Sequence, residues 1–164
     1  MAAVVRKRDS RRVSYAKLRE RLADSALPWD DEAERGAIGA VLLSPNIHAR
    51  KMVKRAFSGH FFDRGHGWLW EQISQALTKN ILTDRERSIA SWLRAADIAA
   101  RFRRQFFGRA GNEIAACLKT GFWWHGNYFI DRVLLAAKTR AGVVNAAEQL
   151  GKALDAADLW RAGQ

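Results

Sequence analysis

A stripe of apolar residues near the C-terminus constrains the fold of this chain more than any other feature. The residues of this C-terminal stripe recur at alternating steps of four and three, with one seven-residue step across Arg140; they are Phe129, Val133, Ala136, Val143, Ala147, Leu150 and Leu154. Such spacing places them on one face of an α-helix. A helix of about 30 residues would be roughly 45 Å long, more than a domain of this size needs. We therefore expect the excess to pack against something else, often a second copy.

A helix of small residues is predicted in LPWDDEAERGAIGAVLLSP, from Leu27 to Pro45. Asp31 stands at the expected N-cap position, and Glu34 three residues later completes an Asp variant of the capping box. The predicted helix ends at about Leu43. Its small residues fall three and four apart and form a smooth face for another helix; they are Ala33, Gly36, Ala37 and Ala40. Glycines such as Gly36 and Gly39 cost roughly 1 kcal/mol each in a helix, so we expect close packing to compensate.

The remaining segments also have helical spacing. A helix starting at Pro45 is expected to bury Ile47, Met52, Val53, Ala56 and Phe57, and a helix after Gly59 is expected to bury Phe61, Phe62, Trp68, Leu69, Ile73 and Leu77. Thr83 and Glu86 form another capping box, residues 95–107 have helical spacing, and a short helix carries Ile114, Ala115 and Leu118 after the turn glycines Gly108 and Gly111.

These patterns contain no convincing strand, hairpin or internal repeat, and they predict an all-α fold. We expect a compact multi-helix bundle followed by a long C-terminal helix or helical hairpin. The expected organisation is a basic N-terminal arm in residues 1–26, a globular bundle in 27–120 and an assembly segment in 121–164.

The basic charge of the chain favours an acidic partner, with nucleic acid as the first candidate, and the alternative is a solvated basic surface. The formal net charge is +11 and the isoelectric point is near 10.6. Two segments concentrate arginine and lysine, and their candidate DNA-binding residues are Arg6, Lys7, Arg8, Arg11, Arg12, Arg101, Arg103, Arg104 and Arg109. The arm either contacts phosphates or acts as a solubilising tail, and we weigh these two interpretations equally.

The second basic segment, RFRRQFFGR, interleaves its arginines with Phe102, Phe106 and Phe107. Arginines neutralise phosphates and aromatic rings stack on exposed bases, so the segment is a candidate DNA-binding patch. The alternative, which we favour, is an ordinary amphipathic helix with its phenylalanines in the core. Trp123 and Trp124 in GFWWHGNY allow the same two interpretations.

No catalytic, cofactor or metal site is expected. The 164 residues contain no P-loop, no HExxH and no G-x-S-x-G motif. His60 and His66 are six residues apart with Asp63 between them. A metal site needs three convergent ligands, and neither a turn nor a helix guarantees that these three converge, so we interpret one histidine as buried or capping and the other as exposed. The carboxylates of Asp30, Asp31, Glu32 and Glu34 are explained by helix capping. We therefore predict no enzyme and no small-molecule substrate.

The chain is expected to be a soluble cytoplasmic protein. Cys117 is its one cysteine, so it forms no intrachain disulfide, and its apolar neighbours favour a small core residue over a nucleophile. No apolar run approaches the ~20 residues of a membrane helix. The start, MAAVVRKRDSRR, lacks the apolar stretch of a secretory signal.

Three blocks in this order resemble the N-terminal domain of DnaB-type replicative DNA helicases. The matching residues are Pro28, Ala33, Glu34, Ile38 and Gly39 in the first block, Phe61, Phe62, His66, Leu69, Trp70 and Ile73 in the second, and Tyr128, Val133, Arg140 and Ala147 in the third. The resemblance spans residues 27–154. His60 replaces the family's usual acidic residue, residues 82–107 match poorly, and the family's ATPase domain has no counterpart in these residues.

The resemblance implies a helical bundle followed by a hairpin that pairs protomers in a hexameric collar, with primase or loader proteins docking on the collar. It thus implies a non-catalytic interaction module in DNA replication that binds itself, as a dimer or ring, or binds a replicative helicase or primase. The expected assembly interface is Phe129, Val133, Ala136, Arg140, Val143, Ala147 and Leu150. The alternative is a small basic DNA-binding protein that uses its Arg/aromatic patches.

Overall fold

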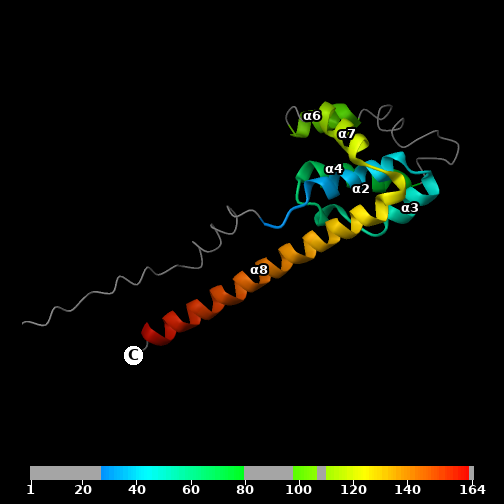
Figure 1. Ribbon diagram of the computed structural model, residues 1–164. Helices are drawn as coiled ribbons and strands as arrows, with labels where there is room; N and C mark the ends of the chain where they lie inside the picture. Colours follow the sequence, from blue (N-terminus) through cyan, green and yellow to red (C-terminus); the bar gives the residue numbers. More distant parts are fainter. Residues whose placement is uncertain (1–26, 80–97, 107–109, 163–164) are drawn as a thin grey trace, which may run out of the picture. The chain divides into compact units, whose positions relative to one another are not determined.

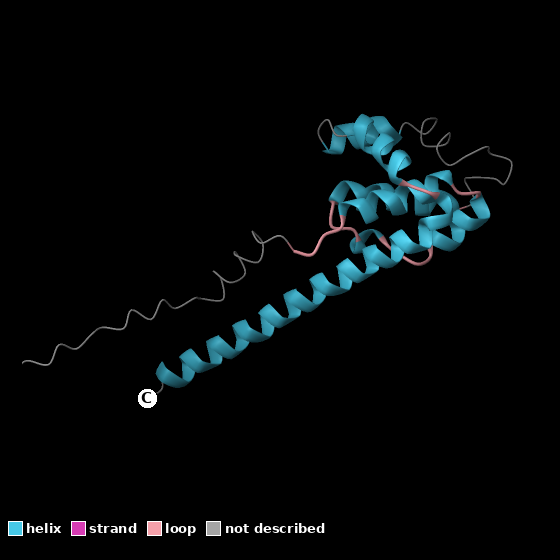
Figure 2. Ribbon diagram, viewed as in Figure 1, coloured by secondary structure: helices cyan, strands magenta, loops and turns pink. Residues whose placement is uncertain are grey.

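The computed structural model describes residues 27–79, 98–106 and 110–162. Within these residues every regular element is a helix, which confirms the predicted all-α fold (Figure 2). The elements are α2 (Asp31–Leu43), α3 (Asn46–Val53), η1 (Ser58–His60), α4 (Arg64–Thr78), α6 (Ile98–Phe106), α7 (Ala110–Thr120), η2 (Trp123–His125) and α8 (Gly126–Ala162). No helix in this part of the chain combines the length and hydropathy needed to span a membrane. The helix expected near Thr83 and Glu86 lies outside the described residues.

The described residues divide into two compact units. Pro28–Thr139 form the first unit, and the second unit contains the rest of α8, from Arg140 onward. Helix α8 begins in the first unit and is continuous from Gly126 to Ala162, so the long helix is observed here and not the hairpin. The first unit extends past the boundary expected at residue 120, because the first turns of α8 pack into its core.

Helix α2 is the centre of the first unit and contacts α3, α4, α7 and η2 (Figure 1). Its glycines permit the closest of these approaches. A methyl group on Gly39 would collide with the carbonyl oxygen of Cys117, and one on Gly121 would collide with the backbone of Gly39. The backbones therefore touch where the end of α7 crosses α2. The small residues of α2 are needed for packing, as its sequence predicts.

The start of α2 differs from the predicted capping box by one residue. Asp30 is the N-cap, and its carboxylate accepts a hydrogen bond from the backbone N–H of Ala33 at 3.0 Å. Glu34 does not turn back to the cap, because its carboxylate binds residues of the η1–α4 segment instead. The predicted end of the helix at Leu43 is confirmed.

The core of the first unit contains most of the residues expected there. Met52, Val53, Ala56, Phe61, Leu69, Ile73 and Leu77 are buried. Ile47 and Phe57 are exposed instead, since they lie on the outer side of α3 and in the turn that follows it. Phe62 is also partly exposed and stacks on Trp29. Trp70, which helical spacing did not place in the core, is fully buried and donates its indole N–H to the carbonyl of Ala56.

An arginine clamp fixes the first turns of α8 to the start of α2. The guanidinium of Arg132 donates to both carboxylate oxygens of Asp30, at 2.7 and 2.8 Å, and to Glu32 at 3.2 Å. Such bidentate pairs fix orientation as well as distance. The hydrogen bonds with Asp30 raise the pKa of Arg132, so the clamp carries a full positive charge.

Candidate functional site

The residues of the expected assembly interface divide into two groups along α8. Phe129 and Val133 are buried in the core of the first unit, where the ring of Phe129 covers Gly36. Side chains used in this way are not available to a partner, so these two residues do not belong to a surface. Ala136, Arg140, Val143 and Ala147 are partly exposed, and Leu150 is 51% exposed. The candidate assembly surface is therefore the later part of the stripe, which consists of Val143, Ala147 and Leu150.

Within α6 the described arginines of the RFRRQFFGR segment lie on the outside, whereas Phe102 and Phe106 pack toward the core. Arg101, Arg103 and Arg104 are exposed, whereas Phe102 is buried and stacks on Phe106 with ring centroids 4.9 Å apart. The rings of α6 therefore belong to the core, as the favoured interpretation has it. Phe107, Arg109 and the arm residues Arg6, Lys7, Arg8, Arg11 and Arg12 lie outside the described residues.

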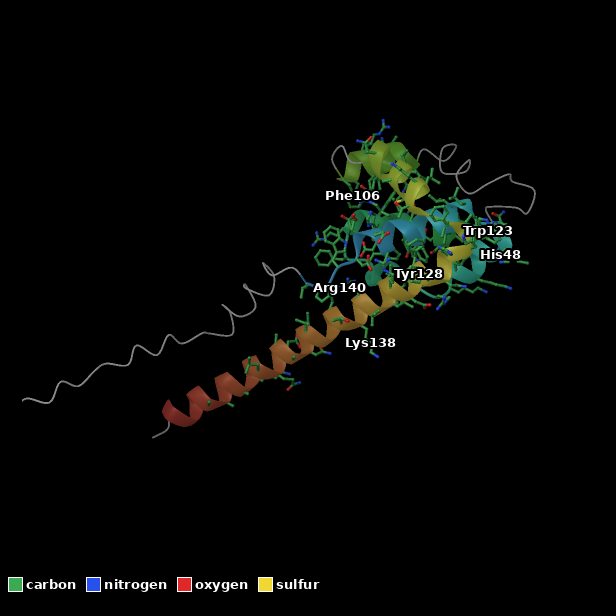
Figure 3. All side chains as sticks on the ribbon, viewed as in Figure 1. His48, Phe106, Trp123, Tyr128, Lys138 and Arg140 are labelled. Carbon is green, nitrogen blue, oxygen red and sulfur yellow. The ribbon has the colours of Figure 1, made fainter. Side chains whose placement is uncertain are left out.

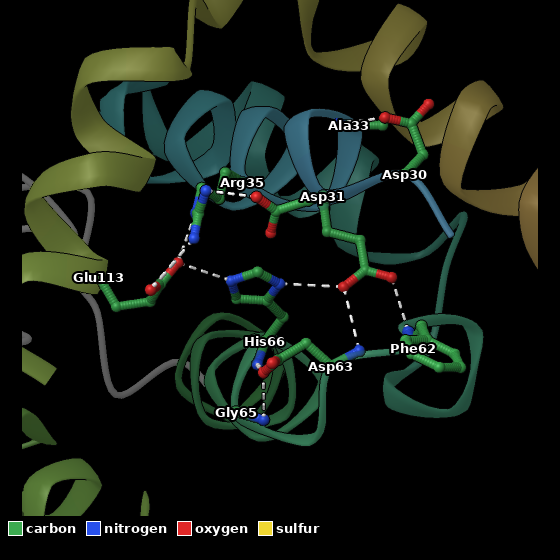
Figure 4. Close-up of polar contacts among 10 residues, drawn as sticks. Asp30, Asp31, Ala33, Arg35, Phe62, Asp63, Gly65, His66 and Glu113 are labelled. Atoms are coloured by element: carbon green, nitrogen blue, oxygen red, sulfur yellow. Dashed lines mark hydrogen bonds and ion pairs between the residues drawn. The ribbon is translucent and has the colours of Figure 1, made fainter. Parts of the chain in front are cut away.

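A buried ion-pair network links α2, α4 and α7 around His66, which is 1% exposed (Figure 4). Its Nδ1 lies 2.9 Å from a carboxylate oxygen of Glu34, and its Nε2 lies 2.9 Å from a carboxylate oxygen of Glu113. Glu34 also accepts the backbone N–H groups of Phe62 and Asp63, at 2.6 and 3.2 Å. Arg35 donates to Glu113 at 2.5 Å and pairs with Asp31. All of these charged groups therefore have opposite charges beside them.

The two carboxylates favour the doubly protonated imidazolium form of His66. Each ring nitrogen must donate a proton to its carboxylate, and neutral imidazole has only one N–H. Burial opposes the charge most strongly, but the hydrogen bonds with Glu34 and Glu113 outweigh it, so the pKa of His66 lies above its ordinary value. Burial also disfavours the ionised form of Glu113, but its bonds to Arg35 and His66 lower its pKa.

His66, Glu113 and Cys117 each offer one ligand atom for a metal ion, within 4.8 Å of one another. The chemistry of this set opposes metal binding. A cation would have to displace the proton on His66 Nε2 and compete with Arg35 for Glu113. Burial raises the pKa of the Cys117 thiol and keeps it protonated, whereas a metal needs the thiolate. The network therefore links three helices and does not resemble an open ligand set.

Two adjoining pockets, of about 400 and 380 Å³, open beside this network. Both are lined by Trp29, Asp63 and Glu113. The larger one is bordered by the α6 rings Phe102 and Phe106. No nucleophile with an adjacent base lies in either lining, so the pockets supply no catalytic constellation within the described residues.

Sequence reasoning missed the role of Glu34, His66 and Glu113. One signal was present in the sequence: Glu34 lies between Ala33 and Gly36, two residues of the face predicted to be buried. A carboxylate on such a face needs a buried partner. The identity of that partner required the three-dimensional structure, since Glu113 is 47 residues from His66 along the chain. Of the two histidines considered, His66 is the buried one, and His60 accepts the backbone N–H of Phe57.

Comparison of the chain with protein-family models, with curated proteins and with solved structures finds no match.

Proposed function

We propose that the protein is a non-catalytic interaction module that assembles through the later part of the C-terminal stripe. One observation carries this proposal. The 4-3 spacing that buries Phe129 and Val133 in the core of the first unit continues on α8 through Val143, Ala147 and Leu150, which retain exposed apolar surface. Val144, which flanks this face, is 40% exposed. Heptad spacing of this kind is the pattern by which helices pair in coiled coils.

We further propose that this module resembles the N-terminal domain of DnaB-type replicative helicases in its role. The support is the order of the three matching blocks, which correspond to α2, to η1 with α4, and to α8. By this resemblance the partner is a second copy of the chain, a replicative helicase or a primase. In this proposal the module has no ATPase activity of its own, because the sequence contains no P-loop motif to hold nucleotide phosphates.

Light scattering after size-exclusion chromatography, over a range of protein concentrations, tests self-association. We expect a dimer or larger ring for the wild type. The disrupting variant is Ala147→Asp with Leu150→Asp, which places two charges on the stripe. The matched control is Ala141→Asp with Leu135→Asp, two exposed positions off the stripe that receive the same pair of changes.

The expected result is a folded monomer for the stripe variant and unchanged assembly for the control. Circular dichroism establishes that both variants keep their helical content. A wild type that stays monomeric at all concentrations, and does not co-elute with a replicative helicase or a primase, would contradict the proposal. Equal loss of assembly in both variants would also contradict it, because the stripe would then have no special role.

A further inference from the structure

Large aromatic side chains lie exposed together around η2. Phe122, Trp123, Trp124 and Tyr128 are 48%, 45%, 61% and 57% exposed. Phe122 and Trp124 have ring centroids 5.5 Å apart, and Trp123 and Trp124 have centroids 5.7 Å apart. The rings of Phe122, Trp123 and Trp124 therefore form one exposed patch, and patches of this kind mark binding sites. We name Phe122, Trp123 and Trp124 the η2 face.

The backbone beneath the η2 face is fixed by close packing. Gly121 lies directly against the backbone of Gly39, and its N–H donates to the carbonyl of Cys117 at 2.8 Å. On the other side of η2, a methyl group on Gly126 would collide with the sulfur of Met52. The backbone that carries the rings is therefore already fixed, and binding has to order only their side chains.

Helix α3 places basic residues beside the η2 face. His48 of α3 lies with its ring centroid 6.1 Å from that of Trp123, and Figure 3 shows these two side chains side by side. Lys51 is about one helical turn beyond His48, and Lys54, the C-cap, is about one turn further, so each lysine neighbours the residue before it on the helix surface. Both lysines are exposed. Cationic groups thus continue directly from the aromatic rings.

The two described segments that carry this surface contain no acidic side chain. Residues 46–62 and 114–130 include no aspartate or glutamate, although they contain Arg50, Lys51, Lys54, Arg55 and Lys119. Asp131 follows the second segment and is paired with Arg55 at 2.5 Å. A protein partner for an apolar patch does not require this excess of positive charge, whereas a polyanion does.

We propose that the η2 face and the adjacent side of α3 bind single-stranded DNA. The exposed rings stack on unpaired bases, and Lys51 and Lys54 neutralise neighbouring phosphates. This combination is typical of proteins that bind single strands without sequence preference. Duplex DNA does not fit equally well, since its bases are already stacked on one another. The residues of this site differ from those of the assembly stripe, so an experiment can refute this inference without refuting the proposed function.

Fluorescence anisotropy of a labelled oligothymidylate of about 12 nucleotides tests this inference, because single-strand binders cover ~4–16 nucleotides. We expect saturable binding at low salt. Trp123→Ala with Trp124→Ala weakens it by roughly fivefold to a hundredfold for each base that loses its stack. The control is Trp29→Ala, a similarly exposed tryptophan. Trp29 precedes the start of α2, whereas the η2 face follows Gly121, which packs against Gly39 further along that helix.

The lysines are tested by the salt dependence of the same binding. Lys51→Gln with Lys54→Gln lowers the slope of log K against log salt by about 1.4, at ~0.7 per phosphate contact on a single strand. The matched control is Lys138→Gln with Lys152→Gln, two exposed lysines of α8, and it lowers the slope less.

Three results would overturn the proposal: no binding at low salt, tryptophan variants that bind as tightly as the wild type, or equal affinity for duplex DNA of the same length. An RNA of matched sequence should bind no more tightly than the DNA, and much tighter RNA binding would overturn the assignment to DNA. Because both tryptophans are exposed, their replacement leaves the fold intact, and a thermal melt of the variant verifies this.

Discussion

Replacing Glu34 by glutamine should destabilise the protein far more than the small chemical change suggests. Glu34 is 1% exposed. Its carboxylate pairs with the imidazolium of His66 and accepts hydrogen bonds from two backbone N–H groups. Removing one member of a buried ion pair costs about 3–5 kcal/mol. Glutamine keeps one oxygen that can accept from Phe62 or Asp63, so we expect the lower end, about 3 kcal/mol. For a chain of this size that corresponds to roughly 6–12 °C in melting temperature.

The pH dependence of stability should change in the same variant. The pKa of His66 is raised above its ordinary value of 6.5, so the stability it contributes is complete below pH 6.5 and is lost as pH rises through the folded-state pKa. The pKa of Glu113 is lowered from 4.5, so its contribution is complete above pH 4.5 and is lost as pH falls through its folded-state value. The network therefore stabilises most between these two limits. Glu34→Gln removes one of the hydrogen bonds that raise the His66 pKa, so it should reduce the loss of stability on the alkaline side.

Urea unfolding at a series of pH values, from about 5 to about 9, measures both effects. The matched control is Glu32→Gln, the same substitution two residues earlier at a 66% exposed side chain paired with Arg132. An exposed pair of this kind contributes about 0–1 kcal/mol. If Glu34→Gln lost no more stability than Glu32→Gln, or if the wild type had constant stability above pH 6.5, the assignment of a charged His66 would be refuted.

Two further predictions concern packing and reactivity. Gly39→Ala should destabilise the folded protein by several kcal/mol in urea unfolding, because the new methyl group would collide with the Cys117 carbonyl. Gly142→Ala should stabilise it by about 1 kcal/mol, because no atom lies within 4 Å of the new methyl group. Equal effects of the two substitutions would contradict the crossing of α7 over α2. Cys117 should react with a thiol reagent only after unfolding, since it is buried and the pKa of its thiol is raised, and fast modification of the native protein would contradict its place in the core.

Local patterns predicted the helices well because each depends on nearby residues. The end of α2 at Leu43 follows from Ser44 and Pro45, and the length of α8 follows from the periodic stripe. The cap of α2 was misplaced by one residue because Asp30 and Asp31 are both good N-cap residues. The structure selects Asp30, whose carboxylate also binds Arg132, 102 residues away. Local sequence contains no information on that contact.

Exposure was harder to predict than helicity. Ile47 and Phe57 are large and apolar, yet they are exposed, while Glu34 and His66 are charged and buried. Composition assigns both pairs to the wrong side, because burial depends on which face of each helix meets a neighbour. The buried ion-pair network has the same origin, because residues from α2, α4 and α7 form it only after the helices pack.

The division of the C-terminal stripe decides where its function can be tested. Phe129 and Val133 contribute to the core, so a charge at Val133 would unfold the first unit and would remove assembly and fold together. From Val143 onward the stripe keeps its spacing but retains exposed surface, as Leu150 shows at 51%. A charge there leaves the core contacts of α8 and the clamp of Arg132 on Asp30 intact. Only substitutions from Val143 onward can therefore abolish assembly while the protein keeps its stability. That result would show that this part of α8 binds a partner and does not only support the fold.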